Sequence, residues 1–296
     1  MPENPPLHEK TAHVSQTAGA MSVPVQAWRG AGGERRTRLT PEEVAVALVF
    51  NGATEAVMMA SPLDLEDFGL GFSLTEGLIA NLDEVSELEV LETELGWEVR
   101  LWIAPDRAAE LSSRRRRQAG PTGCGMCGLE SLEAARRPAK SVRHLTDVSV
   151  TAANLFDAFA ALEAAQVLGS ATRAVHAAGF WTPGEGLVCL REDVGRHNAL
   201  DKVVGALARS RRAGADGIVL LTSRVSVEMV QKSCALGASV LAAVSAPTTL
   251  ALEVAQAAGL SLIGVARTDG FEVFVDELHR VRIEPAFSPQ SSGGLN

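Results

Sequence analysis

The sequence predicts an α/β fold in which a smaller α+β region precedes a larger region built on a mixed or parallel sheet. In the first half of the chain, short strands come in pairs joined by tight turns, which is typical of antiparallel pairing. In the second half, apolar strands alternate with helices of about three turns, which is typical of βαβ crossovers. With 296 residues, 46% of them apolar, the chain can bury a sizeable core.

The first half is expected to form two strand pairs and one helix, with strands at residues 44–50, 53–60, 85–92 and 97–104 and the helix at residues 63–79. The Asn51-Gly52 step supplies the positive φ that a tight hairpin turn requires. Ser61-Pro62 interrupts the strand pattern before apolar residues recur at helical spacing. Ordered structure is expected from about Val23 onwards.

The second half is expected to alternate strands at residues 186–192, 217–222, 239–245 and 261–266 with helices at residues 154–168, 197–210, 226–237 and 248–260. One of these helices ends at Gly237, and glycine is a common helix stop. The alternation predicts a largely parallel sheet. The chain is thereby divided into a disordered tail (1–22), an α+β region (23–110), a Gly-rich loop and linker (111–150), an α/β region (151–285) and a second tail (286–296).

Composition narrows the range of functions. The formal net charge is −9, whereas a general nucleic-acid binder carries a basic face. No run approaches the ~20 apolar residues that a membrane span needs, and no cationic segment followed by an apolar run marks a signal peptide. Four cysteines are too few to cross-link a chain of this length. We therefore expect a cytoplasmic protein that binds neither nucleic acid nor a membrane.

The strongest local signal is GPTGCGMCGLE at residues 120–130, which contains Cys124 and Cys127. Glycine-rich backbone suits a thiol that must be presented to another molecule better than a buried structural cysteine. Arginines at 114–117 upstream, and a helix expected downstream, would both favour the nucleophilic thiolate. The arginine run is also typical of a solvated surface or of a docking site for an acidic partner. By spacing alone, the two cysteines could equally be half of a zinc site or incidental.

The rest of the sequence disfavours zinc. A structural zinc site needs four Cys or His ligands, but there is no second CxxC, Cys189 lies in an apolar strand and Cys234 stands alone on a helix. The zinc-deaminase pattern is absent, because His176 lacks the glutamate that should follow it and comes after the CxxC. On its apolar stretch, His176 is expected to be a core residue. A thioredoxin-like dithiol is weakened too, because its CxxC should follow a strand directly.

Two junctions between a strand and a helix carry groups that suit an anionic ligand. After Gly195, Arg196 and His197 fall at a helix start, where free backbone N–H groups and the helix dipole attract anions. Ser223 and Arg224 follow the next apolar strand, and α/β sheets bind ligands at the carboxyl ends of their strands. Capped helices with surface charges would give the same pattern.

Two further features are weaker. Glu228 and Lys232 stand four residues apart on a predicted helix, and we expect them to form an ordinary surface ion pair. The segment ARTDG at residues 266–270 places one cation and a turn after the last strand.

In this order, the segments CGMCG, VHAAGF, REDVGRHNALDKVVG, SRVSVEMVQK and SAPTTLALEVAQAAGLSLIGVAR resemble the formate dehydrogenase accessory sulfurtransferases, the FdhD family. The resemblance covers roughly residues 23–285. It implies a cytidine-deaminase-like three-layer α/β domain without the deaminase zinc site. It also implies a sulfurtransferase that takes sulfane sulfur from a cysteine desulfurase as a cysteine persulfide. The acceptor would be the molybdenum of a bis(molybdopterin guanine dinucleotide) cofactor destined for formate dehydrogenase.

The resemblance also assigns roles to single residues. Cys124 matches the persulfide cysteine and Cys127 its companion. The segment associated with the guanine dinucleotide is matched by Val265, Ala266, Arg267, Thr268, Asp269 and Gly270. We add Arg196 and His197 from the helix start as candidate cofactor-binding residues, and no metal ligand. This chain departs from the family in having Gly123 where Ser or Thr is common and Val265 where Phe is frequent.

The expected partners are a cysteine desulfurase as donor, formate dehydrogenase as recipient and a second copy of the chain in a homodimer. Two other functions stay open. A chaperone that holds the molybdenum cofactor without sulfur chemistry would keep its function in Cys124→Ala. A CxxC thiol–disulfide oxidoreductase would be damaged as much by Cys127→Ala as by Cys124→Ala.

Overall fold

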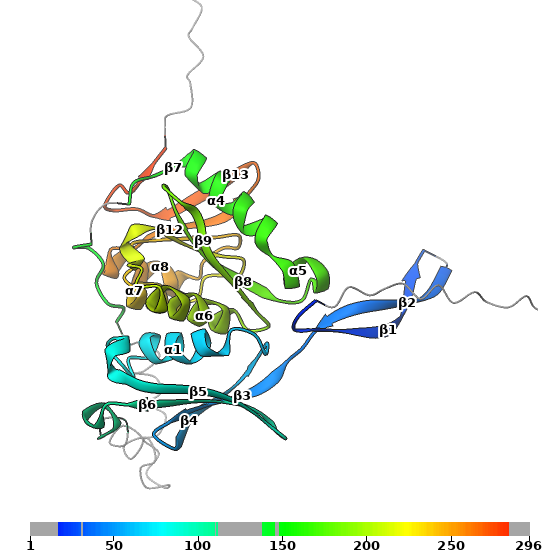
Figure 1. Ribbon diagram of the computed structural model, residues 1–296. Coiled ribbons are helices and arrows are strands. Elements are labelled where there is room, and N and C mark those ends of the chain that lie inside the picture. Colours follow the sequence, from blue (N-terminus) through cyan, green and yellow to red (C-terminus); the bar gives the residue numbers. More distant parts are fainter. Residues whose placement is uncertain (1–16, 31, 110, 112–137, 146–147, 284–296) are drawn as a thin grey trace, which may run out of the picture.

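The computed structural model describes residues 17–30, 32–109, 111, 138–145 and 148–283. Most of the predicted tails and of the 111–150 linker therefore lies outside the described residues. Figure 1 shows a four-stranded sheet, two layers of helices and a six-stranded sheet stacked on one another, with a two-stranded hairpin projecting to one side. This is a mixed α/β fold with several sheets, as the sequence predicted.

The projecting hairpin consists of β1 (Ala20–Arg29) and β2 (Gly32–Pro41), which pair antiparallel over their full length. The sequence analysis did not predict it, and β1 starts ahead of the expected beginning of order near Val23. The alternation of apolar side chains is weak in both strands, and β2 contains Arg35, Arg36 and Arg38. The ladder of backbone hydrogen bonds is what forms this hairpin, and side-chain patterning gives little signal for that.

The four-stranded sheet has the order β4-β3-β6-β5, with β3 at Val44–Phe50, β4 at Ala53–Ala60, β5 at Val85–Thr93 and β6 at Gly96–Ile103. Both predicted hairpins are confirmed, and Asn51 and Gly52 have the positive φ of 48° and 81° that the turn requires. The two hairpins join through a parallel β3–β6 pair. Helix α1 (Leu65–Thr75) covers this sheet and buries Phe68 against Val99 and Leu101.

The six-stranded sheet has the order β13-β12-β11-β10-β8-β9, with β8 at His176–Thr182, β9 at Gly186–Asp193, β10 at Ile218–Leu221, β11 at Val240–Ala243, β12 at Ser261–Arg267 and β13 at Gly270–Val275. Within the described strands of this sheet, only β10, β11 and β12 pair in parallel. The expectation of a largely parallel sheet was therefore wrong. In this sheet the sequence analysis missed β8 and β13. Each forms a hairpin with a neighbour, and a short turn forces antiparallel pairing.

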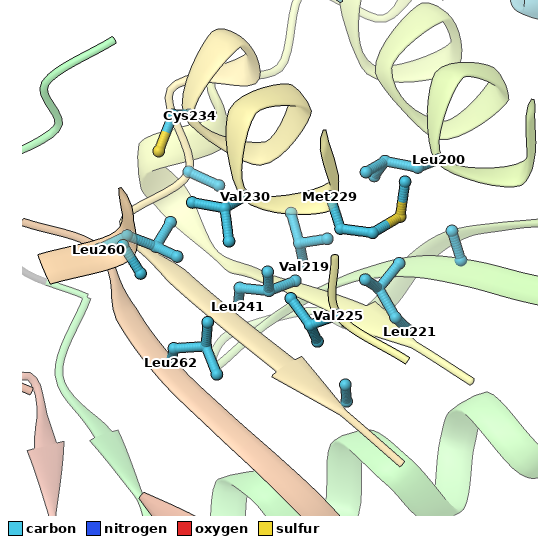
Figure 2. Close-up of a cluster of buried hydrophobic side chains, with 14 of the residues drawn as sticks. Leu200, Val219, Leu221, Val225, Met229, Val230, Cys234, Leu241, Leu260 and Leu262 are labelled. Carbon is cyan, nitrogen blue, oxygen red and sulfur yellow. The ribbon is translucent and has the colours of Figure 1, made fainter. Parts of the chain in front are cut away.

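The helices of the second half are α4 (Ala152–Ala165), α5 (Val167–Thr172), α6 (Arg196–Arg209), α7 (Val227–Leu236) and α8 (Thr249–Ala258). Figure 2 shows α7 side chains such as Met229 and Val230 packed on Val219 and Leu241 of the sheet. The other face of the sheet packs on α4. Three layers result, α–β–α, and the cytidine-deaminase-like description stays a prediction. The short elements are η1 (Leu82–Glu84), η2 (Gly214–Asp216) and the parallel pair β7 (Val150–Thr151) and β14 (Val281–Arg282).

Helices α1 and α6 join the two sheets through direct backbone contact (Figure 1). A Cβ atom added to Gly71 of α1 would lie 1.7 Å from the carbonyl oxygen of Asp201, and one added to Gly205 of α6 would lie 1.9 Å from that of Asp67. Both distances are far below van der Waals contact. Glycine at both positions therefore allows the two helices to cross with no side chain between them.

Candidate anion-binding site

Three helices begin at one edge of the six-stranded sheet. Strand β8 is antiparallel to both β9 and β10, so β9 runs in the same direction as β10, β11 and β12. These four strands end at the same edge, where α6, α7 and α8 start and where the 267–270 turn lies. The residues predicted to contact an anion, Arg196, Arg224 and Arg267 among them, therefore stand along one edge. Their role as ligand contacts stays a prediction.

Two buried polar atoms at this edge have no hydrogen-bond partner among the described residues. They are Nε of Arg196, the first residue of α6, and Oγ of Ser226, the N-cap residue of α7. Neither helix has a side-chain cap on its first N–H groups. A buried polar group without a partner costs about 1–3 kcal/mol. At two adjacent helix starts, polar atoms of the protein therefore lack hydrogen-bond partners. A polar ligand bound at this edge could supply those partners.

His197, the second residue of α6, is already engaged, because its Nε2 lies 2.7 Å from Oε2 of Glu228 on α7. The expected Glu228–Lys232 ion pair was therefore wrong. Lys232 is buried, and its Nζ lies 2.9 Å from Oδ1 of Asp201 and 3.1 Å from Oε1 of Glu76. Burial works against the charge of Lys232, but Asp201 and Glu76 outweigh it and raise the pKa of Lys232. Helix spacing alone could not show that α1 and α6 offer a stronger partner.

His176 begins β8 and lies opposite Asp193 of β9 in the sheet register. It is half-buried at the candidate site, so the expectation of a core histidine holds only in part. Burial lowers the pKa of His176, its neighbours Arg196 and His197 lower it further, and Asp193 acts in the opposite direction. A neutral imidazole is therefore favoured at this edge near pH 7.

The residues after β10 and β12 differ in how far they are available to a ligand. Ser223 is buried and its hydroxyl donates to the carbonyl oxygen of Arg224 at 3.0 Å, whereas the Arg224 side chain is exposed. Nη1 of Arg267 donates to the carbonyl oxygens of Val244 and, at 2.8 Å, of Ala266. Arg267 thereby ties the end of β12 to the loop that precedes α8.

Val265 has a φ of 53°, a left-handed conformation that β-branched residues rarely adopt. Such a residue carries about 1–3 kcal/mol of backbone strain, and strain of this kind is concentrated at functional sites. The pairing of β12 with β13 shifts register here, between Gly264 and Arg267. Thr268 and Asp269 are exposed at the tip, Gly270 is half-buried and Ala266 is buried. The predicted 265–270 segment is thus a distorted turn at the same edge as the starts of α6 and α7.

Asp193 and Lys202 are site-supporting residues that the sequence analysis did not single out. Both side chains are 0% exposed, and Nζ of Lys202 lies 2.6 Å from Oδ2 of Asp193. A lysine within the apolar run NALDKVV was the available signal, because lysine is almost never fully buried unless it is paired.

Cys124, Cys127 and the 114–117 arginines lie outside the described residues. Of the other cysteines, Cys189 is in β9 and Cys234 in α7. Burial raises the pKa of Cys189 to about 11 and that of Cys234 to about 12. Among the residues that the structure describes, no cluster of three His, Cys, Asp or Glu side chains could hold a metal ion. In the same part of the chain, no helix has the length and apolar character needed to cross a membrane.

This chain is similar to known proteins over most of its length. The sequence profile of the FdhD/NarQ family matches residues 41–282. The "Sulfur carrier protein FdhD" of Agrobacterium fabrum is 51% identical over 237 residues, which covers 80% of this chain and 87% of that protein. The protein of the same name from Cupriavidus necator is 46% identical over 277 residues and covers 92% of this chain and 94% of its own length.

One solved structure has the same fold. It comes from Desulfotalea psychrophila and is described as a candidate formate dehydrogenase accessory protein. Its TM-score to this chain is 0.69 at 24% sequence identity, with 89% of this chain and 99% of that chain covered.

Proposed function

Because this chain belongs to the FdhD/NarQ family, we propose that it is a sulfurtransferase that carries sulfane sulfur on Cys124 as a persulfide. The donor is a cysteine desulfurase. The acceptor is the molybdenum of a bis(molybdopterin guanine dinucleotide) cofactor that serves formate dehydrogenase. The observation that carries this proposal is the high identity, over most of the chain, to relatives named as sulfur carrier proteins. The cytoplasm is the expected compartment.

The loading step is a transfer of one sulfur atom between two cysteines. The Cys124 thiolate attacks the terminal sulfur of the desulfurase persulfide, the sulfur–sulfur bond of the donor breaks, and the donor cysteine leaves as a thiolate. A persulfide on Cys124 results, and no external oxidant or reductant is required. Cys127, three residues further on in the sequence, would tune Cys124 or take the sulfur in turn.

The edge where α6 and α7 begin suits the guanine dinucleotide part of the acceptor. Arg196 and Ser226 offer unpartnered polar atoms there, and helix N-termini favour phosphate groups. Arg224, two residues before Ser226 in the sequence, is exposed. In a chain with a net charge of −9, this local arrangement favours an anion that the rest of the surface would repel.

The test of sulfur transfer is the intact mass of the protein after incubation with a desulfurase and cysteine. We expect the wild type to gain about one sulfur atom that reductant removes, and Cys124→Ala to gain none. Cys189→Ser and Cys234→Ser are the matched controls and should load normally. Loading of Cys124→Ala, or maturation of formate dehydrogenase by that variant, would favour the chaperone alternative. Equal damage by Cys127→Ala, without sulfur loading of the wild type, would favour the oxidoreductase.

The nucleotide site has its own test. Titration calorimetry with guanosine, guanosine monophosphate and guanosine diphosphate should show affinity rising with the number of phosphates and falling with salt. Equal affinity for all three would mean that the phosphates bind elsewhere.

A further inference from the structure

Two lysines of this chain are buried as ion pairs near α6, and they lie in different settings. Lys202, in the second turn of α6, reaches back to Asp193, which lies three residues before Arg196, the first residue of that helix. Lys232 of α7 pairs with Asp201, and Thr75 of α1 also accepts from its Nζ at 2.9 Å. Both pairs link the two sheets, because each also contacts the segment between β4 and β5.

The Asp193 carboxylate uses both of its oxygens to hold the turn between β9 and α6. Oδ1 accepts from the backbone N–H of Gly195 at 2.7 Å and from Nδ2 of Asn198 at 3.0 Å. Oδ2 accepts from Nζ of Lys202 at 2.6 Å and from the backbone N–H of Ser61 at 3.0 Å. Arg196 stands between Gly195 and Asn198 in the sequence, so these four hydrogen bonds fix the segment that presents it.

Lys202 and Asn198 extend the same network into the first half of the chain. Nζ of Lys202 also donates to the carbonyl oxygen of Ser61 at 3.0 Å, and Nδ2 of Asn198 donates to that of Met59 at 2.8 Å. The hydroxyl of Ser61 accepts from the backbone N–H of Val194 at 3.2 Å. The end of β4 and the start of α6 are thus held together through the side chains of residues that are at most 2% exposed, namely Ser61, Asp193, Asn198 and Lys202.

The charge of Lys202 has a second effect. An uncompensated carboxylate directly beneath the start of α6 would repel an anion bound there, and burial would strengthen that repulsion. We propose that Lys202 is a positioning residue for the anion site, because it neutralises Asp193 and keeps its carboxylate bonded to the β9–α6 turn. The inference deepens the proposed function and rests on the nucleotide site stated there. Lys232, by contrast, stabilises the fold and has no role in anion binding.

The experiment compares Lys202→Met with Lys232→Met. Each change removes the cation of a buried ion pair, so both variants should lose stability, as followed by urea unfolding. For Lys202→Met we expect guanosine diphosphate affinity to fall at least about tenfold, because the uncompensated Asp193 carboxylate would repel the phosphates and release the turn that presents Arg196. Hydrogen exchange at the amides of Val194 and Gly195 should also become faster. For Lys232→Met we expect the affinity to stay within about twofold, with unchanged exchange at those two amides.

Failure of this inference and failure of the proposed site give different results. If the wild type does not bind guanosine diphosphate, the proposed site is wrong and the positioning role falls with it. If the wild type binds but Lys202→Met keeps its affinity, or if both variants weaken binding equally, the positioning role alone is refuted. Should Lys202→Met not fold, Lys202→Gln keeps a hydrogen-bond donor near Asp193 but leaves its carboxylate uncompensated, and it must show the same loss of affinity.

Discussion

Alkylation of the cysteines provides a sharp test of which thiol can carry sulfur. Only a thiolate attacks a persulfide or an alkylating reagent, so the pKa of each thiol limits its rate. An ordinary thiol with a pKa of about 8.5 is roughly one-quarter ionised at pH 8. With a pKa of about 11, Cys189 is ionised in about one molecule in 1,000, and Cys234, with a pKa of about 12, in about one in 10,000.

Nucleophilicity rises with pKa and offsets part of this difference. A Brønsted coefficient of about 0.45 leaves Cys189 slower than an ordinary thiol by about 20-fold and Cys234 by about 60-fold. Cys234 is buried and Cys189 is partly buried, which slows the reaction of both further because the reagent must reach the sulfur. Both cysteines should therefore be silent on the time scale at which a presented thiol reacts.

The assay is a time course with iodoacetamide at pH 8, read by intact mass, on the wild type and on the double variant Cys124→Ser with Cys127→Ser. We expect two fast additions to the wild type and none to the double variant, and complete reaction of both proteins in denaturant. A fast addition to the folded double variant would refute the reasoning. It would mean that Cys189 or Cys234 is accessible and could take sulfur in place of Cys124.

Three further outcomes are expected. Arg267→Ala should weaken guanosine diphosphate binding by about 1.5–3 kcal/mol in titration calorimetry, and an unchanged affinity would move the phosphate site elsewhere. Burial lowers the pKa of His176, so below about pH 6.5 the unfolded chain binds a proton there more readily than the folded protein. Stability should fall with pH in that range, and His176→Gln should reduce the fall in urea titrations at pH 5 and 7; equal slopes would contradict this. Leu200→Ala empties a fully buried position and should lower the free energy of unfolding by about 2–5 kcal/mol, and a loss below about 1 kcal/mol would mean that the cluster in Figure 2 is loosely packed.

Local sequence signals predicted the elements whose pattern is strong on its own. The β3–β4 hairpin has the predicted bounds, because Asn51-Gly52 specifies the turn and apolar residues specify the strands. Helix α7 ends before Gly237, whose φ of 82° is the left-handed stop expected of it. The signals failed for the β1–β2 hairpin, whose apolar alternation is weak, and for β8, whose place in the sheet depends on pairing with β10, far along the chain. Pairing between strands is a tertiary property, and a single sequence does not display it.

The candidate site was predicted only in its outline. Arg196 and His197 were placed at a helix start because Gly195 breaks the chain, and the structure begins α6 at Arg196. The buried Asp193–Lys202 ion pair next to that helix start could not be predicted. It belongs to a hydrogen-bond network that includes the end of β4, far away in the sequence. For the same reason, helical spacing wrongly predicted that Glu228 pairs with Lys232. Its partner, His197, is on another helix.

The glycine crossing of α1 and α6 also limits how this protein could be recombined with a relative. A Cβ at Gly71 or Gly205 would meet a carbonyl oxygen of the opposite helix, and no rotamer change can move a backbone atom away. Even alanine at one position would have to push the helices apart and disturb the buried groups on both sides of the crossing. A chimera joined between α1 and α6 will therefore fold only if the parent that supplies α1 has glycine at position 71 and the parent that supplies α6 has glycine at position 205. Otherwise the junction must lie outside this pair of helices, so that both come from the same parent.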